Sequence, residues 1–269
     1  MRSAAATLVL VVLVAALGPF LSRDPDEQDL ERKLEGPSRD RLLGTDATGR
    51  DLLARTLAGA RVSLAVGLAA TAVSVAVGVA VGAVAGYAGG RAERLLMGVV
   101  DVLQGLPYVV FVIVLVVAVG RGMLNLFLAI GAVSWLTTAR IVRAEVKALR
   151  SREFVEAARA LGAGPLRILA RHIVPNVLGP VIVYAALTVP MAMRQEAFLS
   201  FLGLGVEPPQ ASLGTLLAEG IESLTPLRAD WWLIAFPGVL LATTILALNT
   251  LADGLRDRLD PRAAGRARP

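Results

Sequence analysis

Apolar residues occur along this chain in long, nearly uninterrupted runs, separated by shorter segments that hold most of the charge. A run of about 20 apolar residues is long enough to cross the hydrocarbon core of a membrane as a helix. Six runs approach or exceed that length, and they occupy residues 4–21, 62–86, 95–119, 122–139, 177–205 and 231–252. The pattern therefore predicts an all-α membrane protein with six transmembrane helices.

Small residues recur at every fourth position of the second run. This spacing places them on one face of a helix, where another helix backbone can approach closely. The pattern predicts a packing stripe rather than a ligand site. The residues of the stripe are Ala70, Ser74, Gly78, Gly82 and Gly86.

Proline lies inside three of the runs, at Pro107, Pro190 and Pro237. Each proline removes a helix hydrogen bond and can bend its helix. Broken helices suit a water-lined pathway through the membrane. Ordinary bent helices fit these prolines equally well, so the pattern leaves both interpretations open.

The distribution of basic residues predicts how the chain is oriented, because short connections rich in Lys and Arg stay in the cytoplasm. Residues 140–171 carry eight basic residues and residues 256–268 carry five arginines, whereas residues 206–230 carry one arginine against four acidic residues. Arg91 and Arg94 mark another inside connection. We therefore expect both termini in the cytoplasm and residues 22–61 and 206–230 outside.

The first apolar run has an alternative interpretation. A basic Met1-Arg2 start followed by an apolar stretch also resembles a cleaved secretory signal peptide. No A-x-A-like cleavage site follows the run, which favours a retained anchor. We accordingly divide the chain into an anchor and external segment over residues 1–61 and a core transmembrane domain over residues 62–269.

Composition agrees with a membrane protein and excludes several other classes. Hydrophobic residues make up 55% of the 269 positions and charged residues only 18%, against about 25% in soluble domains. The absence of cysteine excludes disulfides, thiol catalysis and cysteine-held metals. The net charge of +5 comes mainly from residues that flank the apolar runs, so we expect a lipid bilayer and no nucleic acid as partner.

Three charged residues lie within the predicted spans, namely Asp101, Arg194 and Glu196. A charge at the bilayer centre costs about 3 kcal/mol or more, so each of them needs a polar surrounding. One interpretation places them along a substrate pathway. The other pairs them inside the helix bundle or lets them reach its outer rim.

The connection over residues 140–176 combines helical spacing with a glycine turn. Glu153, Phe154, Ala157, Ala158 and Leu161 follow the spacing of a first helix, which Gly162 and Gly164 interrupt. Pro165 suits the first turn of a second helix, and Pro175 is expected to end it. The apolar face of this two-helix projection either docks on a partner or packs back on its own bundle.

The same connection resembles the EAA loop of bacterial ABC importer permeases. Glu156-Ala157-Ala158, then Gly162, then Ile173-Val174-Pro175 follow the order of that motif. Three further blocks are similar to permeases of dipeptide, oligopeptide and nickel importers: LLGTDATGRDLLARTLAGARVSL, EAFLSFLGLGVEPP and ADGLRDRLDPR. The resemblance implies a type I importer permease with a cytoplasmic coupling loop over residues 140–176. Its expected ATPase-coupling residues are Glu153, Phe154, Glu156, Ala157, Ala158, Arg159, Gly162 and Pro165.

This resemblance also implies the partners of the chain. They would be a second homologous permease subunit, two ATP-binding subunits and an extracytoplasmic solute-binding protein, in the cytoplasmic membrane of a prokaryote. The chain has no G-x-x-x-x-G-K-[ST] phosphate loop, so we expect no cofactor in it, no catalytic activity of its own, and ATP and Mg on the partner subunits. Substrates stay open between dipeptides, oligopeptides and nickel chelates.

Two other functions fit the sequence less well. A secondary transporter or channel driven by an ion gradient would also carry intramembrane charges and broken helices. It gives no role to a long basic cytoplasmic connection and usually has inverted repeats, which are not visible here. An intramembrane hydrolase is disfavoured because the single histidine, His172, lies outside the predicted spans.

Overall fold

The computed structural model describes residues 2–120, 122–225 and 230–259. Within these ranges the chain forms helices and no strand, apart from one isolated bridge between Thr45 and Asp51. Arg228, Arg262, Arg266 and Arg268, which entered the charge counts above, lie outside the described residues.

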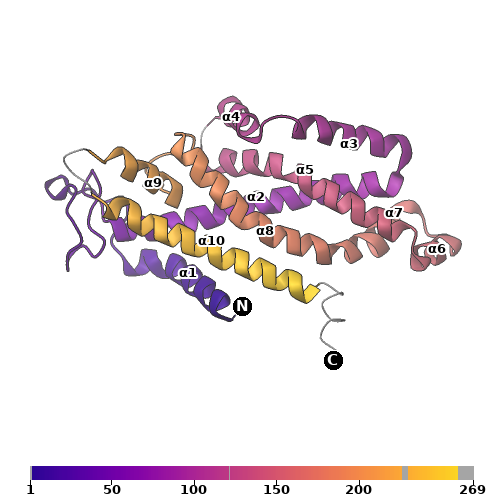
Figure 1. Ribbon diagram of the computed structural model, residues 1–269, viewed down its shortest axis with the longest axis horizontal. Coiled ribbons are helices and arrows are strands. Elements are labelled where there is room, and N and C mark those ends of the chain that lie inside the picture. The colour runs from indigo at the N-terminus through magenta and orange to yellow at the C-terminus, as the bar shows by residue number, and fades with distance from the viewer. Residues whose placement is uncertain (1, 121, 226–229, 260–269) are drawn as a thin grey trace. The chain divides into compact units, whose positions relative to one another are not determined.

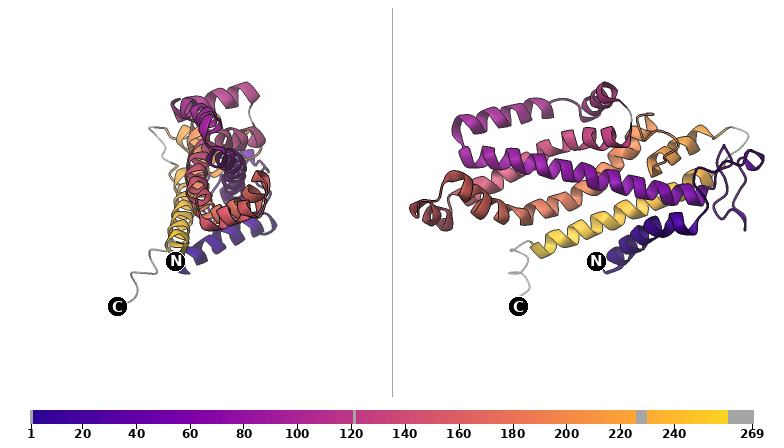
Figure 2. Two further views of the ribbon diagram at one scale, coloured as in Figure 1. Left: turned by 90° about the vertical axis from the view of Figure 1, so that its right-hand side faces the viewer. Right: turned by 180° about the vertical axis from the view of Figure 1, so that it is seen from behind.

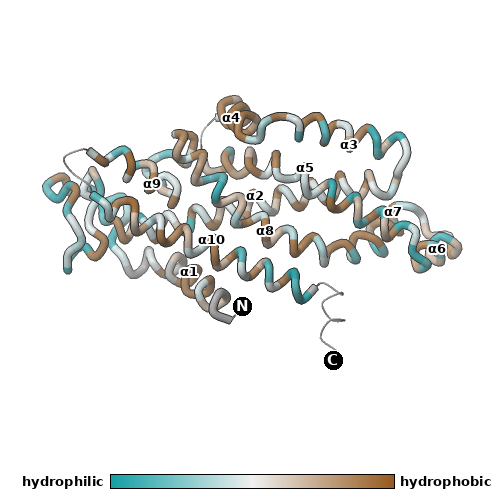
Figure 3. The backbone as a smooth tube through the Cα atoms, viewed as in Figure 1, coloured by the Kyte–Doolittle hydropathy of each residue, from teal (hydrophilic) through white to brown (hydrophobic). Residues whose placement is uncertain are grey.

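The helices follow one another along the chain as labelled in Figure 1. Brown, apolar stretches cover much of the long helices, and teal, polar stretches concentrate in the connections (Figure 3). The elements are α1 (Arg2–Leu21), η1 (Leu30–Arg32), α2 (Leu52–Ala88), α3 (Gly90–Gln104), α4 (Tyr108–Val119), α5 (Met123–Arg150), α6 (Glu153–Ala160), α7 (Pro165–Ile168), the π-helical turn η2 (Leu169–Ile173), α8 (Val174–Phe201), α9 (Leu213–Glu222) and α10 (Trp232–Leu259).

Among the described residues, four helices are long and apolar enough to cross a membrane, and they cover Leu52–Ala88, Met123–Arg150, Pro165–Phe201 and Trp232–Arg258. The bent pair α3 and α4 makes a fifth if it counts as one span. The prediction of a multi-pass helical membrane protein is confirmed. The first apolar run forms the 20-residue helix α1, but the count of six spans stays a prediction.

The predicted third span consists of two helices bent by 93°. Gly105 ends α3 by donating its N–H to the Asp101 carbonyl at 3.0 Å, and the Pro107 carbonyl accepts the Phe111 N–H at 3.0 Å in the first turn of α4. Pro190 and Pro237 instead lie inside helices that continue through them. Of the three prolines, therefore, Pro107 alone coincides with a break, because a glycine two residues earlier has already ended the helix.

The prediction that Pro175 ends the second helix of the connection is wrong. The π-helical turn η2 leads directly into α8, with the Val174 N–H bonded to the Leu169 carbonyl five residues earlier. Pro175 then lies in the first turn of α8, where a missing N–H is tolerated. At the other side, α5 continues to Arg150, so the first part of the 140–176 connection extends a membrane helix.

The described chain forms two compact units. Unit 1 combines Met1–Leu68, Val116–Phe127 and Val189–Leu251. Its core contains Ala15 of α1 packed with buried residues of α2, α8, α9 and α10. Gly18 lets α1 approach α2 closely, because a Cβ at this position would lie 2.8 Å from the Leu57 Cβ. The contacts of Ala15 and Gly18 make α1 an integral part of unit 1.

Unit 2 combines Ala69–Leu115, Leu128–Thr188 and Ala252–Pro269. The packing stripe predicted on α2 is confirmed here: a Cβ on Gly78 would lie 2.4 Å from the Thr138 Cβ, and a Cβ on Gly82 would lie 2.5 Å from the Ala139 carbonyl oxygen. Ser74 and Thr138 share a hydrogen bond of 2.9 Å along the same seam between α2 and α5. The domain boundary at residue 61 stays a prediction.

Candidate functional site

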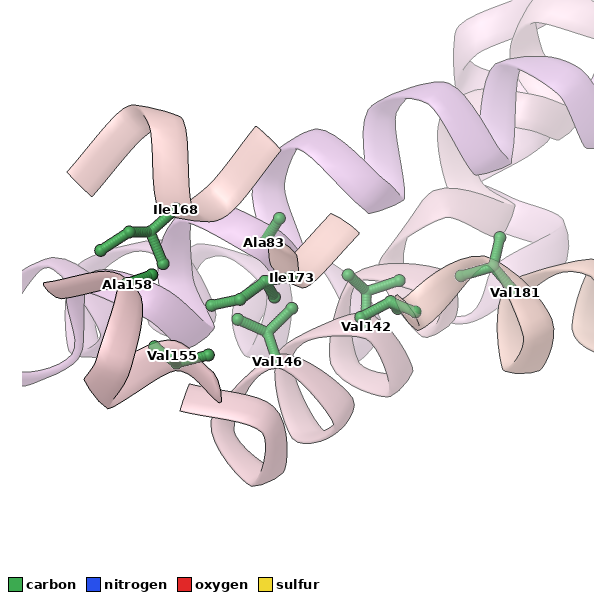
Figure 4. Close-up of a cluster of buried hydrophobic side chains, with 9 residues drawn as sticks. Ala83, Val142, Val146, Val155, Ala158, Ile168, Ile173 and Val181 are labelled. Carbon is green, nitrogen blue, oxygen red and sulfur yellow. The ribbon is translucent and has the colours of Figure 1, made fainter. Parts of the chain in front are cut away.

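One face of α6 packs against its own unit. Val155 and Ala158 are buried, together with Ile168 and Ile173 of the following turns. They contact Val146 of α5 and its neighbours in a single hydrophobic cluster, drawn in Figure 4. The interpretation that the apolar residues pack back on the bundle therefore holds for these positions, and the cluster fixes the loop to the ends of α2, α5 and α8.

A second face of the same loop remains uncovered in the chain. Phe154, Ala157 and Leu161 follow one another at helical spacing and are exposed. The exposed fractions are 40% for Phe154, 88% for Leu161 and 80% for Leu166 in α7. Large apolar side chains grouped in this way are typical of an interaction surface. We call Phe154, Ala157, Leu161 and Leu166 the docking face.

The turn between α6 and α7 has a geometry that only glycine adopts without strain. Gly162 lies at φ +80°, and its N–H bonds the Arg159 carbonyl while the Ala163 N–H bonds the Ala158 carbonyl, both at 3.0 Å. These two bonds satisfy the last carbonyls of α6. Pro165 then begins α7, as predicted from the sequence.

The charged coupling candidates of the loop point to solvent. Glu153, Glu156 and Arg159 are exposed on α6, and none of them forms an ion pair with another described residue. Their charges are therefore available to a partner beside the docking face.

The three candidate pathway residues have very different surroundings. Asp101, in unit 2, forms a 2.5 Å ion pair with Arg140, and both side chains are about half exposed. In unit 1, Arg194 is exposed and has no ion pair with another described residue, whereas Glu196 is fully buried. Arg194 and Glu196 therefore lie on different faces of α8.

Glu196 connects three helices at one point. Its carboxylate accepts hydrogen bonds from Ser63 of α2 at 3.0 Å and from Ser200 of α8 at 2.8 Å. The Ser63 hydroxyl also accepts the N–H of Leu213, the first residue of α9, at 3.1 Å. A buried carboxylate with these partners satisfies polar groups of α2, α8 and α9 together.

Sequence reasoning missed a charged cluster in unit 1, between residues 46–55 and α9. Arg55, with 2% of its side chain exposed, donates to Asp46 at 2.8 Å and to Glu219 of α9 at 2.5 Å. Arg50 pairs with Asp46 at 2.7 Å, and the cluster lines a cavity of about 270 Å³. The i,i+4 spacing of Asp46 and Arg50 could have been noticed in the sequence, but nothing local indicates Glu219.

Burial acts to raise the pKa of Asp46, but its surroundings outweigh burial. Hydrogen bonds from Thr48 and Arg50, together with the charge of Arg55, lower this pKa below its ordinary value of 3.8. Asp46 is therefore ionised at neutral pH, as a partner of two arginines requires.

Comparisons with known proteins agree on one class of membrane protein. The family model for "Binding-protein-dependent transport system inner membrane component" matches residues 78–265. The chain is 44% identical over 267 residues to the oligopeptide transport system permease protein OppC of Escherichia coli (strain K12), covering 97% of this chain and 87% of that protein. It is 41% identical over 256 residues to the dipeptide transport system permease protein DppC of Bacillus subtilis (strain 168), covering 95% and 79%.

A solved structure shows the same fold at lower sequence identity. A chain of the inward-facing MetNI methionine ABC transporter superposes with a TM-score of 0.60 and 19% identity, covering 78% of this chain and 96% of the solved chain. None of these findings favours the ion-gradient-driven alternative.

Proposed function

The chain belongs to the family of binding-protein-dependent transport system inner membrane components, and we propose that it is one of two permease subunits through which an ATP-driven importer moves dipeptides or oligopeptides. The names of its relatives support peptides as the substrate class. Nickel chelates, which the sequence left open, have no such support among the relatives described above.

The docking face is the main support for our proposal that ATP hydrolysis on partner chains drives transport through this subunit. Its apolar side chains are exposed on a loop whose opposite face is anchored in the core of unit 2. Because the loop is packed against α5 and α8, a movement of the partner that shifts the loop also moves these helices. In our proposal two ATP-binding subunits hold ATP and Mg, the docking face and Glu156 contact one of them, and this chain performs no catalysis.

A charge on the docking face tests this role. Leu161→Asp should remove the ATP-binding subunit from the purified complex and abolish peptide uptake, because a buried apolar contact becomes a desolvated charge. Leu161→Met keeps the apolar surface and should retain both. Normal co-purification and uptake with Leu161→Asp would contradict the docking role.

Because Arg194 is exposed, we expect its side of α8 to face a polar surrounding. An arginine exposed to hydrocarbon is expensive, so a second permease subunit or a water-lined pathway is the favoured surrounding. We propose that Arg194 lines the pathway between the two permease subunits. Glu196 would reach the pathway only in a conformation that releases Ser63 and Ser200.

Uptake by the reconstituted importer separates these roles. Arg194→Ala should reduce peptide uptake several-fold while the two permease subunits still assemble. Glu196→Gln keeps most of the hydrogen bonds and tests whether the charge itself is needed. Normal uptake in both variants would contradict the pathway assignment.

The proposed topology places both termini, α6 and α7 in the cytoplasm, with α1 retained as the first of six spans. The core contacts of Ala15 and Gly18 support retention of α1. The external segment and α9 would then face the solute-binding protein. Sequencing the N-terminus of the purified protein tests this, because a start near Asp24 would mean that α1 is removed.

Transport assays test the proposal as a whole. Dipeptide or oligopeptide uptake into proteoliposomes should require ATP, the ATP-binding subunits and a solute-binding protein. Uptake that continues without ATP and collapses with an ionophore would contradict it and favour an ion-gradient transporter.

A further inference from the structure

A groove of about 600 Å³ lies between α3 and α5 in unit 2. The two helices run beside each other in Figures 1 and 2, on the side of unit 2 away from α8. Charged side chains dominate its walls, and none of them belongs to the docking face. They are Glu93, Arg94 and Asp101 from α3, and Arg140, Arg143 and Lys147 from α5.

The charges of the groove do not balance. Glu93 accepts hydrogen bonds from Arg143 at 2.6 Å and from Lys147 at 2.8 Å, and Asp101 pairs with Arg140. Four cationic side chains thus face two acidic ones, which leaves two positive charges in excess. Arg94 forms no ion pair with another described residue. An anion would complete this arrangement.

The position of the groove along α5 corresponds to the depth of lipid head groups. Residues 123–139 of α5 carry no charge, and the first charged residues after them are Arg140 and Arg143, followed by Glu145 and Lys147. Charges that follow an apolar span directly lie where the hydrocarbon ends and lipid phosphates begin. The excess positive charge therefore meets the phosphate layer.

The outer face of α3 adds an apolar surface beside these charges. Leu95, Val99 and Val102 succeed one another at helical spacing, with exposed fractions of 74%, 56% and 72%. Gly98 leaves open space in the wall, since nothing lies within 4 Å of where its Cβ would be. A ligand with an anionic head and apolar chains fits both parts of the surface.

We propose that this groove binds the phosphate head group of an anionic phospholipid, with the acyl chains along Leu95, Val99 and Val102. Basic pockets between membrane helices bind such head groups. Inorganic phosphate shares the head-group chemistry, but it gives no role to the apolar face of α3.

Native mass spectrometry of the purified importer, with the chains that accompany this one, tests the proposal. After exposure to vesicles of phosphatidylglycerol or phosphatidylcholine, the complex should retain phosphatidylglycerol preferentially. Arg94→Gln should reduce that retention several-fold without unfolding the chain, because the substitution leaves no described acidic residue without its ion-pair partner. Arg91→Gln is the matched control, since Arg91 is exposed on the same helix but does not line the groove.

Three outcomes would overturn the proposal. One is equal phosphatidylglycerol retention by Arg94→Gln and Arg91→Gln. Another is displacement of the lipid by millimolar inorganic phosphate, which would identify a free-phosphate site. In the cysteine-free chain, a photoreactive probe on Gly98→Cys should crosslink lipid; crosslinking to a partner permease subunit instead would make the groove a protein interface.

Discussion

Arg55 donates hydrogen bonds to both carboxylate oxygens of Glu219, at 2.5 Å from Nη1 to Oε2 and at 3.2 Å from Nη2 to Oε1. The two residues are 164 positions apart in the sequence. Through this pair the first turn of α2 is bonded to α9, while Asp46, in the segment before α2, accepts a hydrogen bond from the same guanidinium. The segment before α2, α2 itself and α9 are therefore connected within unit 1 through one buried arginine.

Neutralising the carboxylates of this cluster should destabilise unit 1 to different degrees. Glu219→Gln should cost about 1 kcal/mol, because its side chain is 40% exposed and solvent screens the pair. Asp46→Asn should lower the free energy of unfolding by about 3 kcal/mol. The Asp46 side chain is only 8% exposed, and its substitution removes the negative charge that Arg50 and Arg55 both pair with. Thermal unfolding of the purified chain in detergent measures both.

Glu222→Gln provides the control for this pair of variants. Glu222 lines the same cavity and is exposed, but it forms no ion pair with another described residue. Its substitution should leave the unfolding temperature nearly unchanged. Equal losses for Glu219→Gln and Glu222→Gln would show that the observed pair contributes nothing specific.

Acid should destabilise the packing of residues 22–51 through protonation of Asp46. Its pKa in the folded chain lies below the ordinary value of 3.8, so the ionised carboxylate stabilises the fold well above pH 3.8. That contribution is lost as the pH falls from 3.8 through the lower pKa of the folded state. Protease sensitivity of residues 22–51 should therefore be constant between pH 7 and about 5 and rise below about pH 4.

Asp46→Asn should remove this pH-dependent part, because the asparagine does not titrate. If the wild-type chain and the variant lose protection in parallel, Asp46 is not the source of the acid sensitivity.

Filling the seam between α2 and α5 should destabilise unit 2. Gly82→Ala places a Cβ 2.5 Å from the Ala139 carbonyl oxygen and 2.8 Å from the Val142 Cβ, so the helices must separate. We expect a cost of about 1–3 kcal/mol in thermal unfolding. Gly98→Ala, in helix α3 with open space at its Cβ, should instead stabilise the chain by up to about 1 kcal/mol. A neutral Gly82→Ala would contradict the close packing.

The turn between α6 and α7 should accommodate a side chain at Gly164 but not at Gly162. Gly162→Ala forces a residue with a Cβ into φ +80°, which costs about 1–2 kcal/mol and should weaken ATPase association and uptake. Gly164 lies at φ −68°, so Gly164→Ala should behave like the wild type. Neither position has a neighbour within 4 Å of its Cβ, so backbone conformation is the difference that the assay detects. Equal activity in both variants would mean that the turn geometry does not matter for coupling.

Local patterns predicted much of the membrane architecture. Long apolar runs are sufficient for long apolar helices, and the i,i+4 spacing of Gly78 and Gly82 is sufficient for a packing face. The Gly162 turn and the Pro165 helix start are also local, and both were predicted. Pro175 was misjudged because proline ends an isolated helix, whereas here a π-helical turn carries the chain through it.

The candidate site was also predicted only in part from local patterns. Spacing identified an apolar loop, but only packing decided that Val155 and Ala158 are covered while Phe154 and Leu161 are exposed. Every apolar residue of an amphipathic helix gives the same sequence pattern whether its neighbour is the same chain or a partner.

By itself the sequence determined that this protein is a helical, multi-pass membrane chain with a glycine turn in a basic connection, because hydrophobicity and backbone preference act over a few residues. The tertiary structure alone decided that Glu196 binds Ser63, that Arg55 binds Glu219 and that α3 and α5 enclose a basic groove. Those relationships join residues from different helices, and the distance between such residues depends on how the helices pack rather than on any local pattern.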